Sequence, residues 1–136
     1  MIVTLHVATG GWAGLLTKSR LGAVLLGPPV HLAADRIPHE DIADRRFEVA
    51  SGLVCIGLLA MRRGPFDPMT LGAASSSAPD LEHVLPRLRP GGRKLFHDGG
   101  ADHLGGLPAN VQLLLAGGIL GWLLARSQPG WREAQP

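Results

Sequence analysis

The stretch "LPANVQLLLAGGILGWLLA", residues 107 to 125, decides the fold class of this 136-residue chain. Only Asn110 and Gln112 are strongly polar in it, and Pro108 suits a first helical turn, where no N–H is needed. An apolar helix needs roughly 20 residues to cross a bilayer. The stretch therefore predicts a transmembrane helix. A buried helix of a soluble helical domain is the alternative, because length alone does not separate the two.

The residues along and after this stretch favour the membrane interpretation. Gly117 and Gly121 lie four positions apart on one helix face, which lets a second helix approach closely and predicts a homo-oligomer contact. The end of the stretch is marked by two aromatic and two basic side chains, Trp122, Arg126, Trp131 and Arg132. Such residues anchor a helix at the membrane surface with its basic end in the cytoplasm. We therefore expect an integral protein of the cell inner membrane.

The composition of the whole chain points the same way. The hydrophobic fraction is 46%, but the aromatic fraction is only 4%, with 19 glycines and no tyrosine. Apolar character supplied by Leu, Ala, Val and Gly is typical of closely packed helices in or on a membrane. We predict an all-α fold: one domain over residues 1–136, a small bundle of about four to five helices, membrane-embedded or membrane-associated, with the lipid bilayer as its partner.

Charge and cysteine content exclude other classes of protein. The net charge is +2, and the basic residues fall in short clusters such as Arg45–Arg46 and Arg62–Arg63, which flank apolar segments. This placement suits anionic lipid headgroups, whereas a nucleic-acid surface needs a basic stripe with interleaved aromatic side chains. We therefore expect no nucleic acid as partner. Cys55 is the only cysteine, so it forms no disulfide within the chain and is expected to be a buried, unreactive thiol.

Local signals place four further helices. Residues 4–17 form the first, and Ser19 caps a second, which Pro28 and Pro29 are expected to kink or to end, with a new helix over Val30 to Ile37. Val49 to Met61 is the apolar centre of a third helix between two arginine pairs. Asp67 caps a short helix that reaches about Ser77. Residues 86–106 read as a polar loop, and 127–136 as a short tail.

The stretch "VHLAADRIPHED", residues 30 to 41, is the first candidate site. His31, Asp35 and His39 are spaced by four, so an uninterrupted helix would place them on one face. Imidazole and carboxylate are the ligand types that zinc and similar divalent ions take. By itself the stretch is equally consistent with a solvated helix end. We expect His39 and Asp41, beyond Pro38, to lie behind the ligands or to face solvent.

Two further acidic and histidine-rich stretches strengthen the metal interpretation. They are "APDLEH" at 78–83 and "HDGGADH" at 97–103, and five of the six histidines lie in the three stretches of a chain that is only 18% charged. Such side chains at membrane depth are costly to bury unless they hold a metal or have another function. The predicted ligands of a divalent ion, expected to be zinc, are His6, His31, Asp35, Asp80, His83, His97 and His103.

These motifs resemble those of a known family. His6 with Thr9-Gly10, the turn Pro79-Asp80-Leu81-Glu82-His83 and the pair His31-x-x-x-Asp35 are similar to motifs of the membrane-bound metal-dependent hydrolases, a family of small bacterial helical proteins. In this chain the His-x-x-x-Asp pair precedes the Pro-Asp turn, so the order is permuted. The loop at 97–103 lacks the Arg and Thr of the family's His-Arg-Gly-x-Thr-His loop. The all-helical zinc-dependent phospholipase C fold similarly uses His-x-x-x-Asp.

The resemblance implies a hydrolase. A bound divalent ion would lower the pKa of a water molecule toward about 7 and polarise a phosphoryl or carbonyl oxygen, with Glu82 or Asp102 as general base. The expected substrate is a phosphoester or another lipid-borne molecule. Two other functions stay open: a non-catalytic helical membrane protein that serves as scaffold or assembly partner, and a soluble helical domain that binds a partner through its apolar faces.

Overall fold

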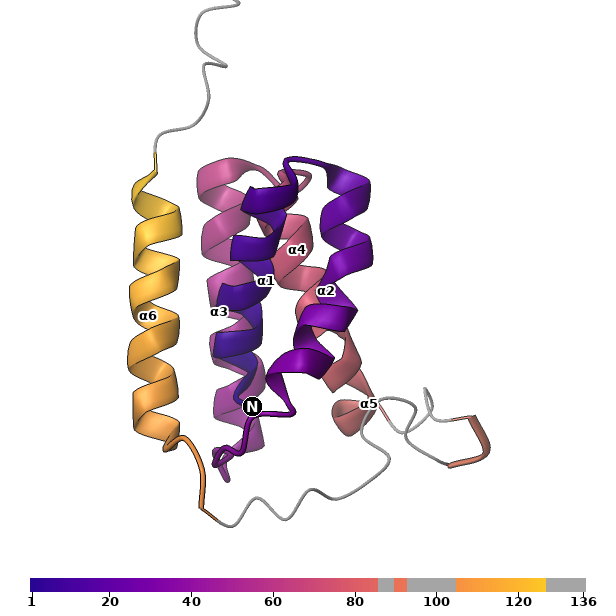
Figure 1. Cartoon of the computed structure of the whole chain (residues 1–136), viewed down its shortest axis with the longest axis vertical. Coiled ribbons are helices and arrows are strands. Elements are labelled where there is room, and N and C mark those ends of the chain that lie inside the picture. Colours follow the sequence, from indigo (N-terminus) through magenta and orange to yellow (C-terminus); the bar gives the residue numbers. More distant parts are fainter. Residues whose placement is uncertain (86–89, 93–104, 127–136) are drawn as a thin grey trace, which may run out of the picture.

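The computed structural model describes residues 1–85, 90–92 and 105–126, and this part of the chain is a helical bundle (Figure 1). Helices α1, α3 and α6 run in one direction, and α2 and α4 run in the other. The predicted all-α bundle is thereby confirmed. The elements are α1 (Val3–Thr17), α2 (Arg20–Ala34), α3 (Arg45–Arg63), α4 (Pro68–Ser77), the 3-10 turn η1 (Ala78–Asp80), α5 (Leu81–Val84), the 3-10 turn η3 (Pro90–Gly92) and α6 (Ala109–Ala125).

Short polar side chains fix where the helices begin. The Ser19 hydroxyl accepts a hydrogen bond from the Gly22 amide at 3.2 Å, and the Asp67 carboxylate accepts one from the Met69 amide at 2.8 Å. Both residues were predicted as N-caps, and α4 spans the predicted residues. Asp44 caps α3 in the same way through the amides of Arg46 and Phe47. Each cap satisfies backbone N–H groups that have no partner within the helix.

Of the two outcomes expected at Pro28 and Pro29, a kink or a new helix, the new helix is wrong, because α2 continues through both prolines and ends at Ala34. A proline inside a helix removes one backbone hydrogen bond, but tertiary packing can hold the helix together. Here Gly27 lies directly against Ser75 of α4, and the Ser75 hydroxyl donates to the Ala23 carbonyl at 3.1 Å. The contact with α4 therefore supports α2 immediately before the two prolines.

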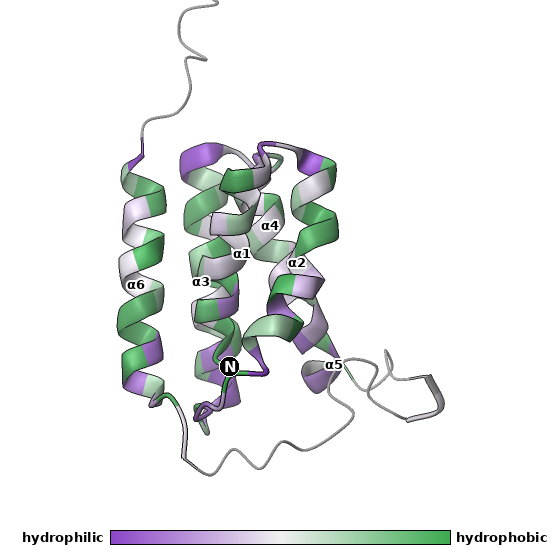
Figure 2. Cartoon of the chain, in the orientation of Figure 1, coloured by the Kyte–Doolittle hydropathy of each residue, from purple (hydrophilic) through white to green (hydrophobic). Residues whose placement is uncertain are grey.

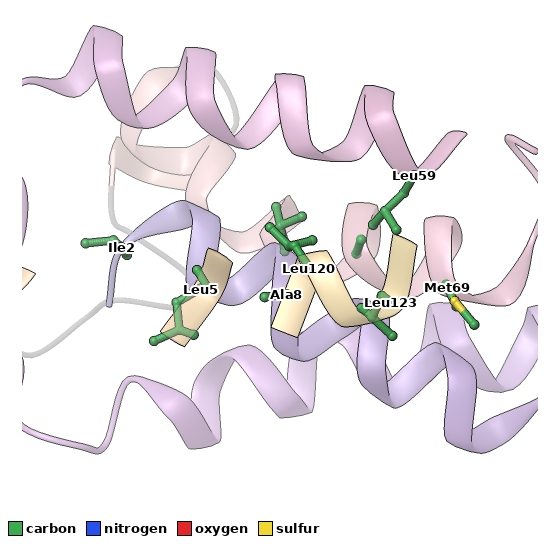
Figure 3. Close-up of a cluster of buried hydrophobic side chains, with 10 residues drawn as sticks. Ile2, Leu5, Ala8, Leu59, Met69, Leu120 and Leu123 are labelled. Carbon is green, nitrogen blue, oxygen red and sulfur yellow. The ribbon is translucent and has the colours of Figure 1, made fainter. Parts of the chain in front are cut away.

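Glycines account for the close packing of α1 on α4. A Cβ atom at Gly10 would collide with Gly72 and Ser76, and one at Gly14 would collide with the Pro68 carbonyl. The apolar core then fills the space between α1, α3, α4 and α6, with Leu5, Ala8, Leu59, Met69, Leu120 and Leu123 among its side chains (Figure 3). Gly10 and Gly14 therefore allow the backbones of α1 and α4 to approach closely.

Helix α6 is shorter than the predicted transmembrane helix. It has 17 residues and begins after Pro108, because Leu107 instead pairs with the loop after α2: its amide donates to the Pro38 carbonyl at 2.8 Å, and its carbonyl accepts from the Glu40 amide at 3.1 Å. Among the helices that the structure describes, none combines the length and the apolar character needed to cross a bilayer. The predicted transmembrane span is therefore not found in this part of the chain.

Candidate metal centre

Three metal-ligating side chains from three elements meet at the end of the bundle where α1 begins. His6 on α1, His31 on α2 and Asp80 in η1 each offer one ligand atom, and these atoms all lie within 4.8 Å of one another. Both histidines are completely buried, and Asp80 is half-buried. The two imidazole rings stack with their centroids 3.7 Å apart. The sequence prediction is thus confirmed in part, since three of its ligands form a group that could hold a metal ion.

The helix directions explain why residues far apart in the sequence meet here. His6 lies in the first two turns of α1, whereas His31 lies in the last turn of α2, which runs antiparallel to α1. Helix α4 runs in the same direction as α2, so its C-terminal end reaches the same end of the bundle and places Asp80 in the turn that follows. The permuted order of the motifs therefore does not prevent their convergence.

Asp35 links the two histidines. One carboxylate oxygen lies 3.0 Å from His6 Nε2, and the other lies 3.0 Å from His31 Nε2. The same carboxylate accepts a hydrogen bond from the α-ammonium group of Met1 at 2.8 Å. The predicted one-turn spacing of His31 and Asp35 is realised at the end of α2. A carboxylate against the second nitrogen of a histidine orients the ring beside a metal, and Asp35 is placed to orient two. We call His6, His31, Asp35 and Asp80 the His–Asp cluster.

Burial keeps His6 neutral. It lowers the pKa of His6 from 6.5 to about 4; the contact with Asp35 opposes this shift, and the neighbouring His31 adds to it. At neutral pH the ring therefore carries a free lone pair, which is the form that binds a metal. His6 Nδ1 is buried without a hydrogen-bond partner among the described residues, and the contact of Nε2 with Asp35 is not aligned as a hydrogen bond. An additional ligand would relieve this deficit.

Glu48 on α3 belongs to the electrostatic surroundings of the cluster and was missed from the sequence. Burial first, and then the charges of Asp41 and Asp80, raise its pKa to about 7. Its Oε1 atom is buried and has no hydrogen-bond partner among the described residues. One signal was present: Glu48 precedes Gly52 by one turn, and Gly52 packs against Val3 of α1. A glutamate on the same face as a packed glycine points toward the neighbouring helix.

The remaining predicted site residues have different surroundings. His83 is half-buried and lies outside the group of three, and its backbone carbonyl accepts a hydrogen bond from Arg45 Nη1 at 2.8 Å. Glu82, a predicted general base, is buried in α5. The other predicted base and two predicted ligands, Asp102, His97 and His103, lie outside the described residues.

His39 does not face solvent. It is buried, and its Nδ1 atom lies 2.6 Å from the Ile37 carbonyl, while Nε2 contacts the Met1 α-ammonium group and lies 3.3 Å from the exposed Asp41. Backbone hydrogen bonds pair the loop that carries His39 with Leu107. Cys55 is half-buried, and burial raises the pKa of its thiol, so the thiol stays protonated at neutral pH.

Comparisons with protein-family models, with curated proteins and with solved structures find no match for this chain. The functional argument therefore depends on the chemistry of the His–Asp cluster and its surroundings.

Proposed function

We propose that this protein is a membrane-associated, metal-dependent hydrolase that holds a divalent ion, zinc by ligand type, between His6, His31 and Asp80. The observation that carries the proposal is the convergence of two buried imidazoles and one carboxylate within 4.8 Å. Zinc ligands lie about 2.0 to 2.2 Å from the ion, so a small closing movement of these side chains suffices to form the site. The unsatisfied nitrogen of His6 supports the same conclusion.

The surroundings of the ion suit hydrolysis. A bound divalent ion supplies an activated water with a pKa near about 7. The Asp35 carboxylate oxygens lie 3.0 Å from the Nε2 atoms of both rings, and a neutral ring with its proton on Nε2 keeps its lone pair on Nδ1. Glu82 and Asp102 remain the proposed general bases. The proposed substrate is a phosphoester or another lipid-borne molecule, and the exposed apolar residues Leu81 and Leu85, on and next to α5, support a substrate with an apolar portion.

Metal content tests the proposal most directly. We expect the purified wild-type protein to retain about one equivalent of divalent ion, measured by elemental analysis after dialysis against metal-free buffer, because three ligands are in place. The variant His31→Ala should lose the ion. The matched control is His83→Ala, which removes a histidine outside the group of three and should keep it. A metal-free wild-type protein that does not bind added zinc would contradict the proposal.

Hydrolysis is the second measurement. The zinc-loaded protein should cleave a chromogenic phosphomonoester, a phosphodiester or a phospholipid, and Asp80→Asn should reduce the rate by about a hundredfold or more, since it removes a ligand of the ion that activates water. If the protein binds zinc but cleaves none of these substrates, the proposed metal site stands and the proposed hydrolase activity is wrong.

An open glycine face on α6 favours a second function, that of a scaffold or assembly partner. A Cβ atom added at Gly117 or Gly121 would meet nothing within 4 Å, so none of the residues that the structure describes covers this face. Glycines on an exposed face let another helix approach closely. If the protein is a scaffold, Gly117→Ile should abolish self-association in analytical ultracentrifugation, and His31→Ala should have no effect on it.

A further inference from the structure

A second set of metal-ligating side chains lies beside the three residues proposed to hold zinc. Asp35 follows α2 as its C-cap, and His39 and Asp41 come next in the loop that leads to α3. Figure 2 shows hydrophilic residues gathered around the N-terminus, at the end of the bundle where α2 ends and α3 begins. The loop therefore brings an imidazole and a second carboxylate to the same end of the bundle as Asp35.

The hydrogen bonds of His39 decide which of its ring nitrogens carries the proton. Nδ1 lies 2.6 Å from the Ile37 carbonyl, and because a carbonyl oxygen only accepts, Nδ1 must donate to it. An ammonium group only donates, so Nε2 accepts from the α-ammonium group of Met1. A histidine that binds a metal through one nitrogen usually donates from the other to a carbonyl or a carboxylate. The buried ring of His39 is therefore held in the orientation of a metal ligand.

The Met1 α-ammonium group marks a position at which these side chains stabilise a positive charge. Its nitrogen lies 2.8 Å from an oxygen of Asp35 and 3.6 Å from an oxygen of Asp41, and it contacts His39 Nε2. The same nitrogen of His39 lies 3.3 Å from Asp41. Two carboxylates and one imidazole around a single positive charge are the ligand types that divalent ions take.

Asp35 connects this position to the proposed zinc site. The carboxylate oxygen that accepts from Met1 also lies 3.0 Å from His6 Nε2, and the other oxygen lies 3.0 Å from His31 Nε2. Both of these histidines are completely buried, whereas the side chain of Asp41 is 56% exposed. The position at Met1 therefore reaches solvent through Asp41, on the side from which a substrate can approach.

We propose that Asp35, His39 and Asp41 bind a second divalent ion. The ion takes the position of the Met1 α-ammonium group, which moves aside. Because one ligand is exposed and the ammonium must be displaced, this site fills only at zinc concentrations well above those that saturate the first site. Its role in catalysis rests on the hydrolase proposed above: two ions at adjacent sites can stabilise the attacking and leaving oxygens of a phosphoryl group, which favours a phosphoester over a carboxylic ester as substrate.

Calorimetric titration with zinc, after dialysis against metal-free buffer, tests the second site in the full chain. Dialysis removes the weakly held second ion and leaves the first in place. Asp41→Asn removes the charge of one ligand at an exposed position, and Glu40→Gln, the matched control, removes the same charge from the neighbouring exposed residue. His39→Gln is the second test variant, and circular dichroism establishes that it keeps its helices.

We expect wild type and Glu40→Gln to take up one further equivalent of zinc, and Asp41→Asn and His39→Gln to bind it at least about tenfold more weakly. No further uptake by wild type, or equal affinities in Asp41→Asn and Glu40→Gln, would overturn the second site and leave the first unaffected. If instead dialysed wild type retains no ion, but added zinc binds and is lost in Asp41→Asn, the first site is wrong and the second stands.

Discussion

Two fully buried polar side chains lie on neighbouring helices, Gln112 on α6 and His6 on α1. They differ in how many of their polar atoms have a hydrogen-bond partner. The Gln112 side-chain oxygen accepts a hydrogen bond from the Ile2 amide at 3.0 Å, and its nitrogen donates to the Glu40 and Leu107 carbonyls at 2.7 and 2.9 Å. His6, in contrast, has a buried nitrogen without a partner among the described residues.

The difference between Gln112 and His6 indicates that buried polar side chains have two roles in this protein. A satisfied group such as Gln112 joins three backbone segments and stabilises the fold. An unsatisfied buried group costs about 1 to 3 kcal/mol, and it is best explained where a ligand completes the bonding. The comparison therefore predicts that changes at Gln112 alter stability without altering metal binding, and that changes at the His–Asp cluster alter metal binding first.

Replacing Gln112 should have the largest effect on the free energy of unfolding. Gln112→Ala removes the hydrogen bonds to the Ile2 amide and to the Glu40 and Leu107 carbonyls, of which the Leu107 carbonyl keeps its bond from the Glu40 amide, and it opens a cavity, so we expect it to lower the free energy of unfolding by about 4 kcal/mol. Chemical denaturation of the metal-free protein measures this.

The matched control is Asn110→Ala on the exposed side of the same helix, where the side-chain oxygen accepts a hydrogen bond from the Val111 amide. We expect a loss below about 1 kcal/mol for the control. Equal losses in both variants would show that Gln112 does not join the segments as its contacts indicate.

Zinc should supply the bond that His6 lacks. At a free zinc concentration of 100 times the dissociation constant, wild type should gain about 2.7 kcal/mol of stability, because the ion binds the folded state preferentially. His31→Ala should gain nothing, and Gln112→Ala should gain as much as wild type. A zinc-induced rise in the melting temperature of His31→Ala equal to that of wild type would place the ion elsewhere.

Lowering the pH should reduce the stability of the protein because His6 is buried. Its pKa is 6.5 when unfolded and about 4 when folded, so its contribution to stability is present above 6.5 and is lost as the pH falls toward 4. Between pH 7 and 5 the loss is about 2 kcal/mol. The variant His6→Leu, also free of metal, has no imidazole and should not show this loss. The difference in unfolding free energy between wild type and His6→Leu should therefore change by about 2 kcal/mol between pH 7 and pH 5.

Taking the difference is necessary because Glu48 titrates in the same range with the opposite effect on stability. If the difference between wild type and His6→Leu stays constant from pH 7 to pH 5, the pKa of His6 is not lowered in the folded protein, and burial does not hold the ring neutral.

The sequence was sufficient for those parts of the fold that depend on local signals. Ser19, Asp67 and Pro68 mark helix starts through backbone chemistry that needs no tertiary contact, and the structure has helices where they predict them. The course of α2 through Pro28 and Pro29 depends on its contact with α4, which no local signal contains. Pairing between Leu107 and the loop after α2 likewise shortened α6 against its apolar pattern.

The residues of the candidate site also fall into those that the sequence predicts and those that depend on tertiary contacts. His31 and Asp35 could be paired from their spacing, and Asp80 from its proximity to other ligand types. Glu48 could not be found by clustering, because it stands in an apolar helix and joins the site only through the packing of α3 on α1. Gln112 looked like a polar interruption of a membrane span, whereas its role depends on three backbone groups, of which those of Ile2 and Glu40 are distant in sequence.

The smallest effect should come from Glu48, whose buried oxygen is unsatisfied like the nitrogen of His6. Its pKa is 4.5 in the unfolded chain and about 7 in the folded protein, so the folded state keeps a proton that the unfolded state has lost. Stability from this group is therefore present below about 4.5 and declines as the pH rises to 7. Because Glu48 is half-exposed, screening limits the loss to about 1 kcal/mol.

Glu48→Gln cannot ionise and should be more stable than wild type by that amount at pH 8, and equal to it at pH 4.5, in chemical denaturation of the metal-free protein. Glu40→Gln, an exposed glutamate on the neighbouring loop, should change neither value. If Glu48→Gln were instead less stable at pH 8, the ionised carboxylate would have a favourable partner in the folded protein, and the likeness between Glu48 and His6 would fail.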